Sequence, residues 1–137
     1  MKRIILCLVM LLLTVSCDIT RSKQIKETQN FYLATTTADN VNIAHADPAN
    51  QDYYILVTSY GAGWTIHTAY SNSQFIVAII TDQKTEIVQG YVIIEIFPAC
   101  GNTDESWSIE DYYNKNAFEE ALRRKKIVLS DMSITKW

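Results

Sequence analysis

The sequence predicts an α+β domain, in which a mostly antiparallel β-sheet is packed by one C-terminal helix. Two observations predict this class. Between residues 53 and 97, four stretches rich in apolar and β-branched residues are separated by short polar or glycine-rich turns, as in a four-strand meander. Near the C-terminus, residues 117–126 contain good helix formers with a narrow apolar stripe. Residues 31–137 are about as long as one small domain.

The strands expected in the meander are residues 53–60, 64–70, 75–80 and 86–97. The second stretch alternates, with Trp64 and Ile66 on one side and Thr65 and His67 on the other. The third stretch is apolar on both faces, which is typical of a central strand. Because short connections usually join antiparallel neighbours, we expect the four strands to lie side by side in sequence order.

The segments around the meander complete the predicted fold. Residues 31–37 predict an earlier strand, and residues 41–46 alternate in a way that suits a short one. Residues 98–107 have the composition of a loop. The helix is expected to begin at Ser108 or Asn116, because each has an acidic residue three positions later that can complete a capping box. The last residues up to Trp137 predict a final strand.

The N-terminus has the order of parts of a secretory signal peptide. Lys2 and Arg3 precede an unbroken apolar run at residues 4–13, which is shorter than the roughly 20 residues that cross a bilayer. The run leads into the sequence LTVSC at residues 13–17. This sequence resembles the lipobox of bacterial lipoproteins. The resemblance covers residues 1–17 only, and no family is recognised for the remainder of the chain.

The resemblance implies an anchored protein of the bacterial cell envelope. Residues 1–16 would be the signal peptide, and Cys17 would become the first mature residue and carry palmitate and further acyl chains into the bilayer. Asp18 resembles the retention signal of inner-membrane lipoproteins, and without such retention the outer membrane is expected. Residues 17–30, the lipidated cysteine and an almost wholly polar stretch, are expected to form a tether of about 20 Å.

Charge and composition exclude one class of partner. The formal net charge is −3, and it becomes about −5 when Lys2 and Arg3 leave with the signal peptide. An acidic chain with evenly mixed charges is not expected to bind nucleic acid.

Two cysteines, Cys17 and Cys100, remain in the mature chain. The envelope is oxidising, so a disulfide between them is one interpretation. Lipidation of Cys17 excludes that disulfide, because the sulfur then forms a thioether. In that case Cys100 is expected to be a buried thiol, or to link two chains.

Two surfaces are candidates for binding. Tyr and Trp are enriched at interfaces, which points to the aromatic residues around the 61–63 turn and before the helix: Tyr60, Trp64, Tyr112 and Tyr113. A run of basic residues could contact anionic headgroups, although it also suits an exposed helix C-terminus: Arg123, Arg124, Lys125 and Lys126.

No catalytic, metal-binding or cofactor-binding pattern is recognised in the sequence. The leading interpretation is therefore a non-enzymatic envelope lipoprotein that binds another protein, as an accessory, inhibitor or immunity factor. One alternative is a secreted periplasmic domain that binds a ligand or acts as an enzyme and contains a Cys17–Cys100 disulfide. Another is a structural envelope component that dimerises through Cys100.

Overall fold

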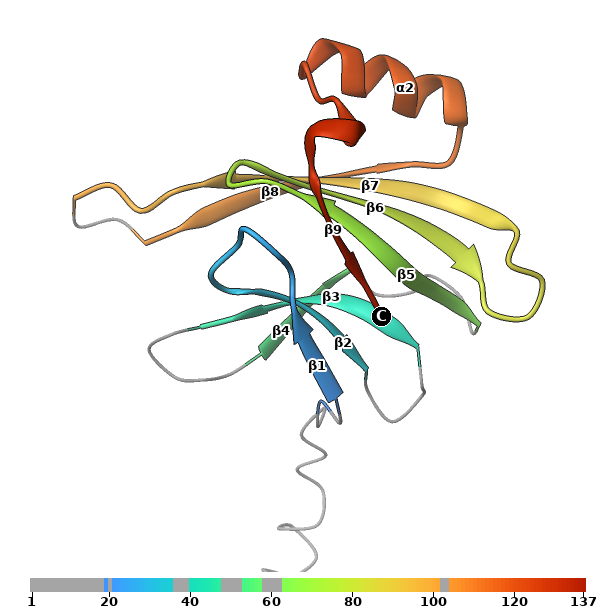
Figure 1. Cartoon of the computed structure of the whole chain (residues 1–137), viewed down its shortest axis with the longest axis horizontal. Helices are drawn as coiled ribbons and strands as arrows, with labels where there is room; N and C mark the ends of the chain where they lie inside the picture. The colour runs from blue at the N-terminus through green and yellow to red at the C-terminus, as the bar shows by residue number, and fades with distance from the viewer. Residues whose placement is uncertain (1–18, 20, 36–39, 48–52, 58–62, 102–103) are drawn as a thin grey trace, which may run out of the picture.

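The computed structural model describes residues 19, 21–35, 40–47, 53–57, 63–101 and 104–137. They form two antiparallel sheets and one helix (Figure 1). The first sheet contains β1 (Arg21–Gln24), β2 (Phe31–Thr35), β3 (Val41–Ala46) and β4 (Tyr53–Val57), in that order. The second sheet has the order β8-β7-β6-β5-β9, with β5 (Trp64–Ser71), β6 (Phe75–Asp82), β7 (Val88–Phe97), β8 (Ser106–Tyr112) and β9 (Ser133–Lys136).

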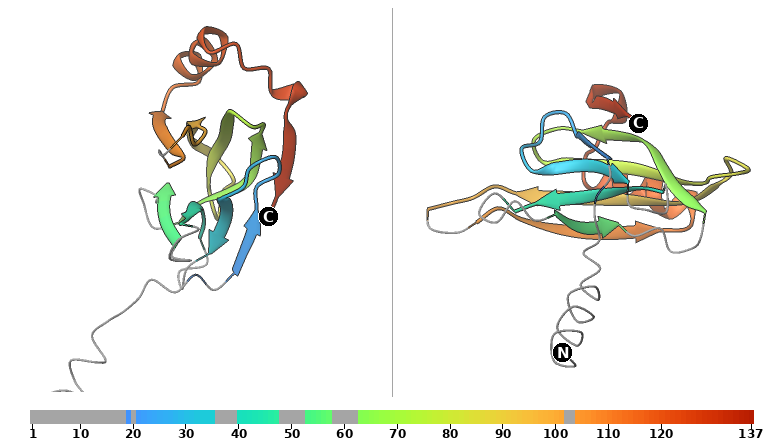
Figure 2. Two further views of the ribbon diagram at one scale, coloured as in Figure 1. Left: turned by 90° about the vertical axis from the view of Figure 1, so that its left-hand side faces the viewer. Right: turned by 90° about the horizontal axis from the view of Figure 1, so that it is seen from below.

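The sheets pack face to face, and helix α2 (Lys115–Arg124) covers the outer face of the five-stranded sheet (Figure 2). The inter-sheet core lies between the two sheets and includes Ile25, Leu33, Ile43, Ile76 and Ile94. The helix-side core lies beneath α2 and includes Phe75, Val77, Ile93 and Phe118. The five-stranded sheet therefore buries side chains on both of its faces.

Strand β7 shows how the sequence produces these two cores. Its side chains alternate between the faces of the sheet, as in any strand. Ile94 and Ile96 enter the inter-sheet core, whereas Ile93 enters the helix-side core. The neighbouring strand β6 is apolar on both faces for the same reason. The expectation of a central strand at residues 75–80 is confirmed.

The mostly antiparallel architecture with one C-terminal helix is confirmed, but the predicted meander is divided between the sheets. Strands β5, β6 and β7 are consecutive antiparallel neighbours, as expected. Strand β4 instead pairs with β3, and β5 pairs with β6 and β9. The connection from β4 to β5 thus crosses from one sheet to the other. A short connection fits such a crossing between layers as well as a hairpin, so its length could not distinguish the two.

The segment predicted to be a tether joins the fold at Arg21. Residues Arg21–Gln24 form β1, which pairs with β2, and Ile25 is fully buried in the inter-sheet core. The Ile25 N–H donates to the Phe31 carbonyl at 2.9 Å, which closes the β1–β2 turn. All four β1 side chains are exposed. A polar composition suits an exposed edge strand as well as a tether, which explains the difference.

The region before the helix also differs from the sequence-based expectation. Ser106 and Trp107, predicted as loop, and Ser108, predicted as a helix N-cap, lie within β8, which pairs with β7 along its length. Asn114 is the N-cap, since its side-chain oxygen accepts hydrogen bonds from the N–H groups of Asn116 and Ala117. The helix ends where Lys126 has φ 56° and its N–H donates to the Arg123 carbonyl.

Candidate functional site

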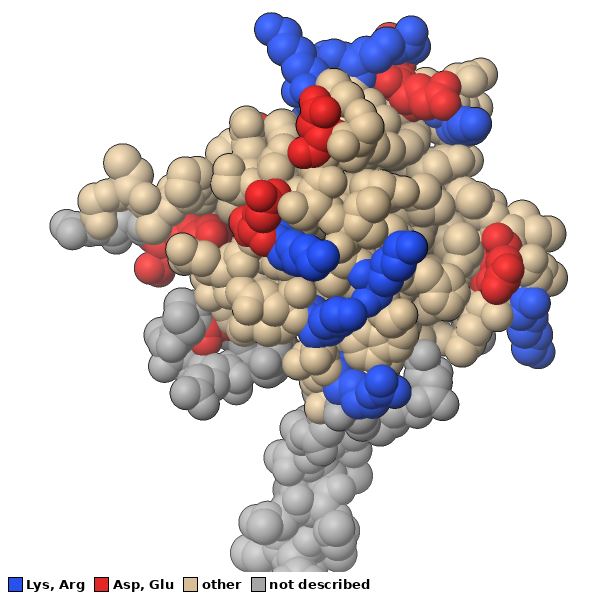
Figure 3. Space-filling model, in the orientation of Figure 1, with Lys and Arg blue, Asp and Glu red and all other residues tan. Residues whose placement is uncertain are grey.

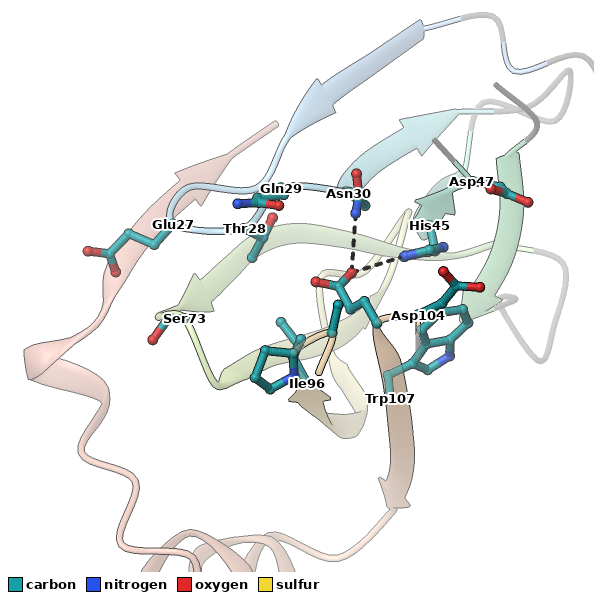
Figure 4. Close-up of a pocket in the computed structure, with 13 residues that line it drawn as sticks. Glu27, Thr28, Gln29, Asn30, His45, Asp47, Ser73, Ile96, Asp104 and Trp107 are labelled. Carbon is teal, nitrogen blue, oxygen red and sulfur yellow. Dashed lines mark hydrogen bonds and ion pairs between the residues drawn. The ribbon is translucent and has the colours of Figure 1, made fainter. Parts of the chain in front are cut away.

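A cavity of about 780 Å³ opens at one end of the two packed sheets (Figure 4). Its lining comes from four places: the β1–β2 turn, the end of β3, the β5–β6 turn and the connection from β7 to β8. The cavity therefore requires both sheets, and its residues come from segments far apart in the sequence.

A partly buried polar cluster forms one wall of the cavity. The His45 Nε2 lies 3.2 Å from Oε1 of Glu105, and the Asn30 Nδ2 donates to the same oxygen at 3.4 Å. The side chain of His45 is 7% exposed and that of Glu105 is 20% exposed. Because an ionised carboxylate only accepts hydrogen bonds, the Nε2 of His45 carries the proton in this pair.

Aromatic rings hold His45 in place. The Trp107 ring lies against the imidazole with a centroid separation of 4.1 Å, and Phe31 contacts it edge-on at 4.9 Å. The other imidazole nitrogen, Nδ1, is buried and has no hydrogen-bond partner among the residues that the structure describes. A buried polar atom without a partner costs about 1–3 kcal/mol, so a donor that reached Nδ1 would stabilise the site.

The cavity is acidic. Four of its lining side chains are carboxylates, and no lysine or arginine is present in the described lining: Glu27, Asp47, Asp104 and Glu105. In the view of Figure 4, the Asp104 carboxylate is drawn between the side chains of His45 and Trp107, and Asp47 lies beyond His45. Carboxylates beside the face of an indole ring favour a cation over an anion, by charge attraction and by cation–π contact.

Sequence reasoning did not find this cluster. His45 and Glu105 are 60 residues apart, and Glu105 lies in a segment that was predicted to be a loop. The available signal was the position of His45 in a short stretch with Val41, Ile43 and Ala46, because a histidine that such a strand buries needs a polar partner. The identity of that partner depends on how the two sheets pack.

The aromatic residues predicted as a binding surface lie in different places. Tyr60 is outside the described residues. Trp64 packs against the inter-sheet core, whereas Tyr112 packs against the helix-side core on the other face of the sheet. Tyr113 is 65% exposed. The structure does not bring Trp64 and Tyr112 together.

The basic run at the helix C-terminus divides into paired and exposed residues. Lys125 is 16% exposed and contacts Glu110 at 2.9 Å and Glu95 at 3.4 Å, which ties α2 to β7 and β8. Arg124 lies 3.7 Å from Glu110, and Arg123 and Lys126 are exposed. Lys125 is therefore mainly a structural contact of the helix.

Glu110 gives the fold a pH dependence that can be measured. Hydrogen bonds from Tyr112 and then Lys125 lower the pKa of Glu110 below its ordinary value of 4.5. The pKa of Glu110 is lower in the folded state than in the unfolded state. The ionised Glu110 therefore stabilises the fold above pH 4.5, and this stabilisation is lost as pH falls through the folded-state pKa. Glu110→Gln should therefore destabilise the protein at pH 7 by up to about 1 kcal/mol, a solvent-screened value for a side chain that is 38% exposed.

Urea unfolding at pH 7 and pH 3 checks this expectation. The difference between wild type and Glu110→Gln should shrink at the lower pH. Tyr112→Phe, which removes the first of the two hydrogen bonds, should give part of the same effect. If wild type and Glu110→Gln differed in unfolding free energy by the same amount at both pH values, the lowered pKa of Glu110 would be contradicted.

The two cysteines are placed differently. Cys17 lies outside the described residues, and Cys100 is exposed. The expectation that Cys100 is a buried thiol is wrong. Ile96 is the last core residue of β7, and the three residues between it and Cys100 are already exposed: Phe97, Pro98 and Ala99.

Within the described part of the chain, no group of three or more His, Cys, Asp or Glu residues is arranged to hold a metal ion. No helix among the described residues is long and apolar enough to span a membrane. Comparisons with protein-family models, with curated proteins and with solved structures find no match to this chain.

Proposed function

We propose that this chain is a lipid-anchored, non-enzymatic protein of the bacterial envelope that binds another protein through the acidic cavity. The lipobox-like sequence ending at Cys17 supports the anchor, and Asp18 favours retention at the inner membrane. The observation that carries the binding role is the acidic lining around His45 and Trp107. This chain would act on that partner as an accessory, an inhibitor or an immunity factor.

The chemistry of the cavity favours a lysine or arginine side chain of the partner. A cationic group would lie near the carboxylates of Asp104 and Glu105 and against the Trp107 indole. No nucleic acid and no cofactor enters this proposal.

Burial of His45 favours binding over catalysis. In many enzymes a carboxylate orients a catalytic histidine, as Glu105 could orient His45. This similarity supports the alternative that the chain is an enzymatic domain. A general base must come within about 3 Å of the proton that it removes. His45 is only 6% exposed and is held between Phe31 and Trp107, so a binding role suits it better.

Titration with short peptides tests the binding role. In ¹H–¹⁵N NMR spectra, a Gly-Lys-Gly peptide should shift the Trp107 indole N–H signal in a saturable manner, and a Gly-Glu-Gly peptide should not. Glu105→Gln keeps an oxygen for His45 and Asn30 but removes the charge, and it should weaken binding several-fold. Glu120→Gln, which makes the same change on the exposed face of α2, should bind as wild type does. Equal responses to both peptides, or an unaffected Glu105→Gln variant, would reject the proposal.

Intact-mass measurement of the membrane-extracted protein tests the anchor. The expected mass is that of residues 17–137 plus a diacylglyceryl group and a further acyl chain. A Cys17–Cys100 disulfide would instead give an unlipidated mass without the two thiol hydrogens, and would favour the secreted alternative. Because Cys100 is exposed, a disulfide-linked dimer would appear as a doubled mass that is lost on reduction, and would favour the structural alternative.

A further inference from the structure

Basic side chains gather over β1 and β9 on one face of the molecule (Figure 3). The β1–β9 basic surface consists of Arg21 and Lys23 of β1, Lys26 of the turn that follows, and Lys136 of β9, all of them exposed. In segments 21–30 and 133–137, Glu27 is the only acidic residue, and it lines the cavity at the far end of β1. The surface thus adjoins the acidic cavity at Lys26 and Glu27 but contributes no basic side chain to its described lining.

Specific contacts hold this surface together. The Lys23 Nζ donates to the Lys136 carbonyl at 2.7 Å, which joins the edges of the two sheets. The Arg21 guanidinium lies over the Trp137 ring, 5.3 Å from its centroid. The Lys26 N–H donates to the Thr135 hydroxyl at 2.9 Å. Three basic residues of one segment are therefore aligned with a fourth from a strand more than a hundred residues away.

The position of β1 brings this surface close to the proposed anchor. Arg21 begins β1 and follows Cys17 by four residues, which span at most about 14 Å even when fully extended. The domain therefore cannot stand far from a bilayer that holds the lipid of Cys17. Lysine and arginine within about one Debye length of anionic headgroups, roughly 8 Å at physiological salt, are attracted to them. Tryptophan beside them suits the interfacial region of a bilayer.

We infer that the β1–β9 basic surface lies against the anionic headgroups of the membrane to which Cys17 is attached. This inference rests on the lipid anchoring proposed above. It replaces the run 123–126 as the membrane contact, because α2 lies on the outer face of the five-stranded sheet and β1 belongs to the other sheet (Figure 1). The acidic cavity is lined by the turn that follows β1, so it lies at the end of this surface that is farther from Arg21.

Hydrogen–deuterium exchange of the mature lipidated protein in vesicles tests the inference. Amides of residues 21–30 and 133–137 should exchange several-fold more slowly in vesicles that contain phosphatidylglycerol than in vesicles of phosphatidylcholine alone. Added salt should reduce the difference. The double variant Lys23→Glu/Lys136→Glu should lose this difference in exchange between the two kinds of vesicle. Each basic residue is expected to contribute about fivefold to the equilibrium constant for contact between this surface and the anionic headgroups.

A matched variant on the helix provides the control. Arg123→Glu/Lys126→Glu changes the net charge equally but should keep the slow exchange of residues 21–30. Equal exchange in the two kinds of vesicle, or slower exchange at residues 115–126 instead, would overturn the inference. Flotation of the same samples shows whether the protein is anchored. If the protein floats with the vesicles but its exchange does not depend on the lipid, the membrane contact of the β1–β9 basic surface is wrong and the anchor stands. If the protein does not float, the anchor itself is wrong.

Discussion

Replacing Ile25 by alanine is expected to lower the free energy of unfolding by about 2–5 kcal/mol, as for other fully buried large-to-small changes. Ile25 is 0% exposed and belongs to the inter-sheet core, although eleven of the thirteen residues from Asp18 to Asn30 are polar or charged. Removal of its side chain would leave a cavity beside Phe31, whose carbonyl accepts the Ile25 N–H. Urea unfolding followed by circular dichroism measures the effect.

Ile134→Ala is the matched control for Ile25→Ala. Ile134 lies on β9 and is 42% exposed, so loss of its side chain should cost less than about 1 kcal/mol. Similar small losses for both variants would show that residues 21–30 are a tether after all. The outcome also bears on the membrane contact, because the short distance from Cys17 depends on β1 being part of the fold.

Phe118→Ala is expected to cost about 3–5 kcal/mol, by removal of the largest buried side chain of α2. The Phe118 ring stacks on Tyr91 with a centroid separation of 4.2 Å and an interplanar angle of 12°, and it lies 6.2 Å from the ring of Tyr112. The helix buries Phe118 and Ala121 against the sheet and leaves most of its other side chains exposed. Much of the attachment of α2 therefore depends on this one ring.

Glu120→Ala, an exposed change on the same helix, should leave stability within about 0.5 kcal/mol of wild type. Near-ultraviolet circular dichroism of Phe118→Ala should also change, because Tyr91 and Tyr112 lose their aromatic neighbour. A loss below 1 kcal/mol would mean that Lys125 and its contacts with Glu95 and Glu110 hold the helix instead. The two large predictions address different cores, since Ile25 and Phe118 lie on opposite sides of the five-stranded sheet.

The elements with strong internal periodicity were predicted correctly. Strands β5, β6 and β7 and helix α2 carry alternation or a helical stripe within their own residues, so each could be recognised alone. Strands β1 and β8 were missed because most of their side chains are exposed and polar. Their strand conformation comes from pairing with a neighbour, β2 or β7, rather than from their own composition.

The amino-acid sequence by itself determined the mostly antiparallel class, the single C-terminal helix and the expectation of a leader that ends at Cys17. Those features depend on order and periodicity along short stretches of chain. Only the tertiary structure decided that β4 belongs to the first sheet, that Ile25 is in the core and that His45 meets Glu105. The physical reason is that the apolar face of a strand is buried by residues far away in the sequence. The pattern within the strand does not identify which residues those are.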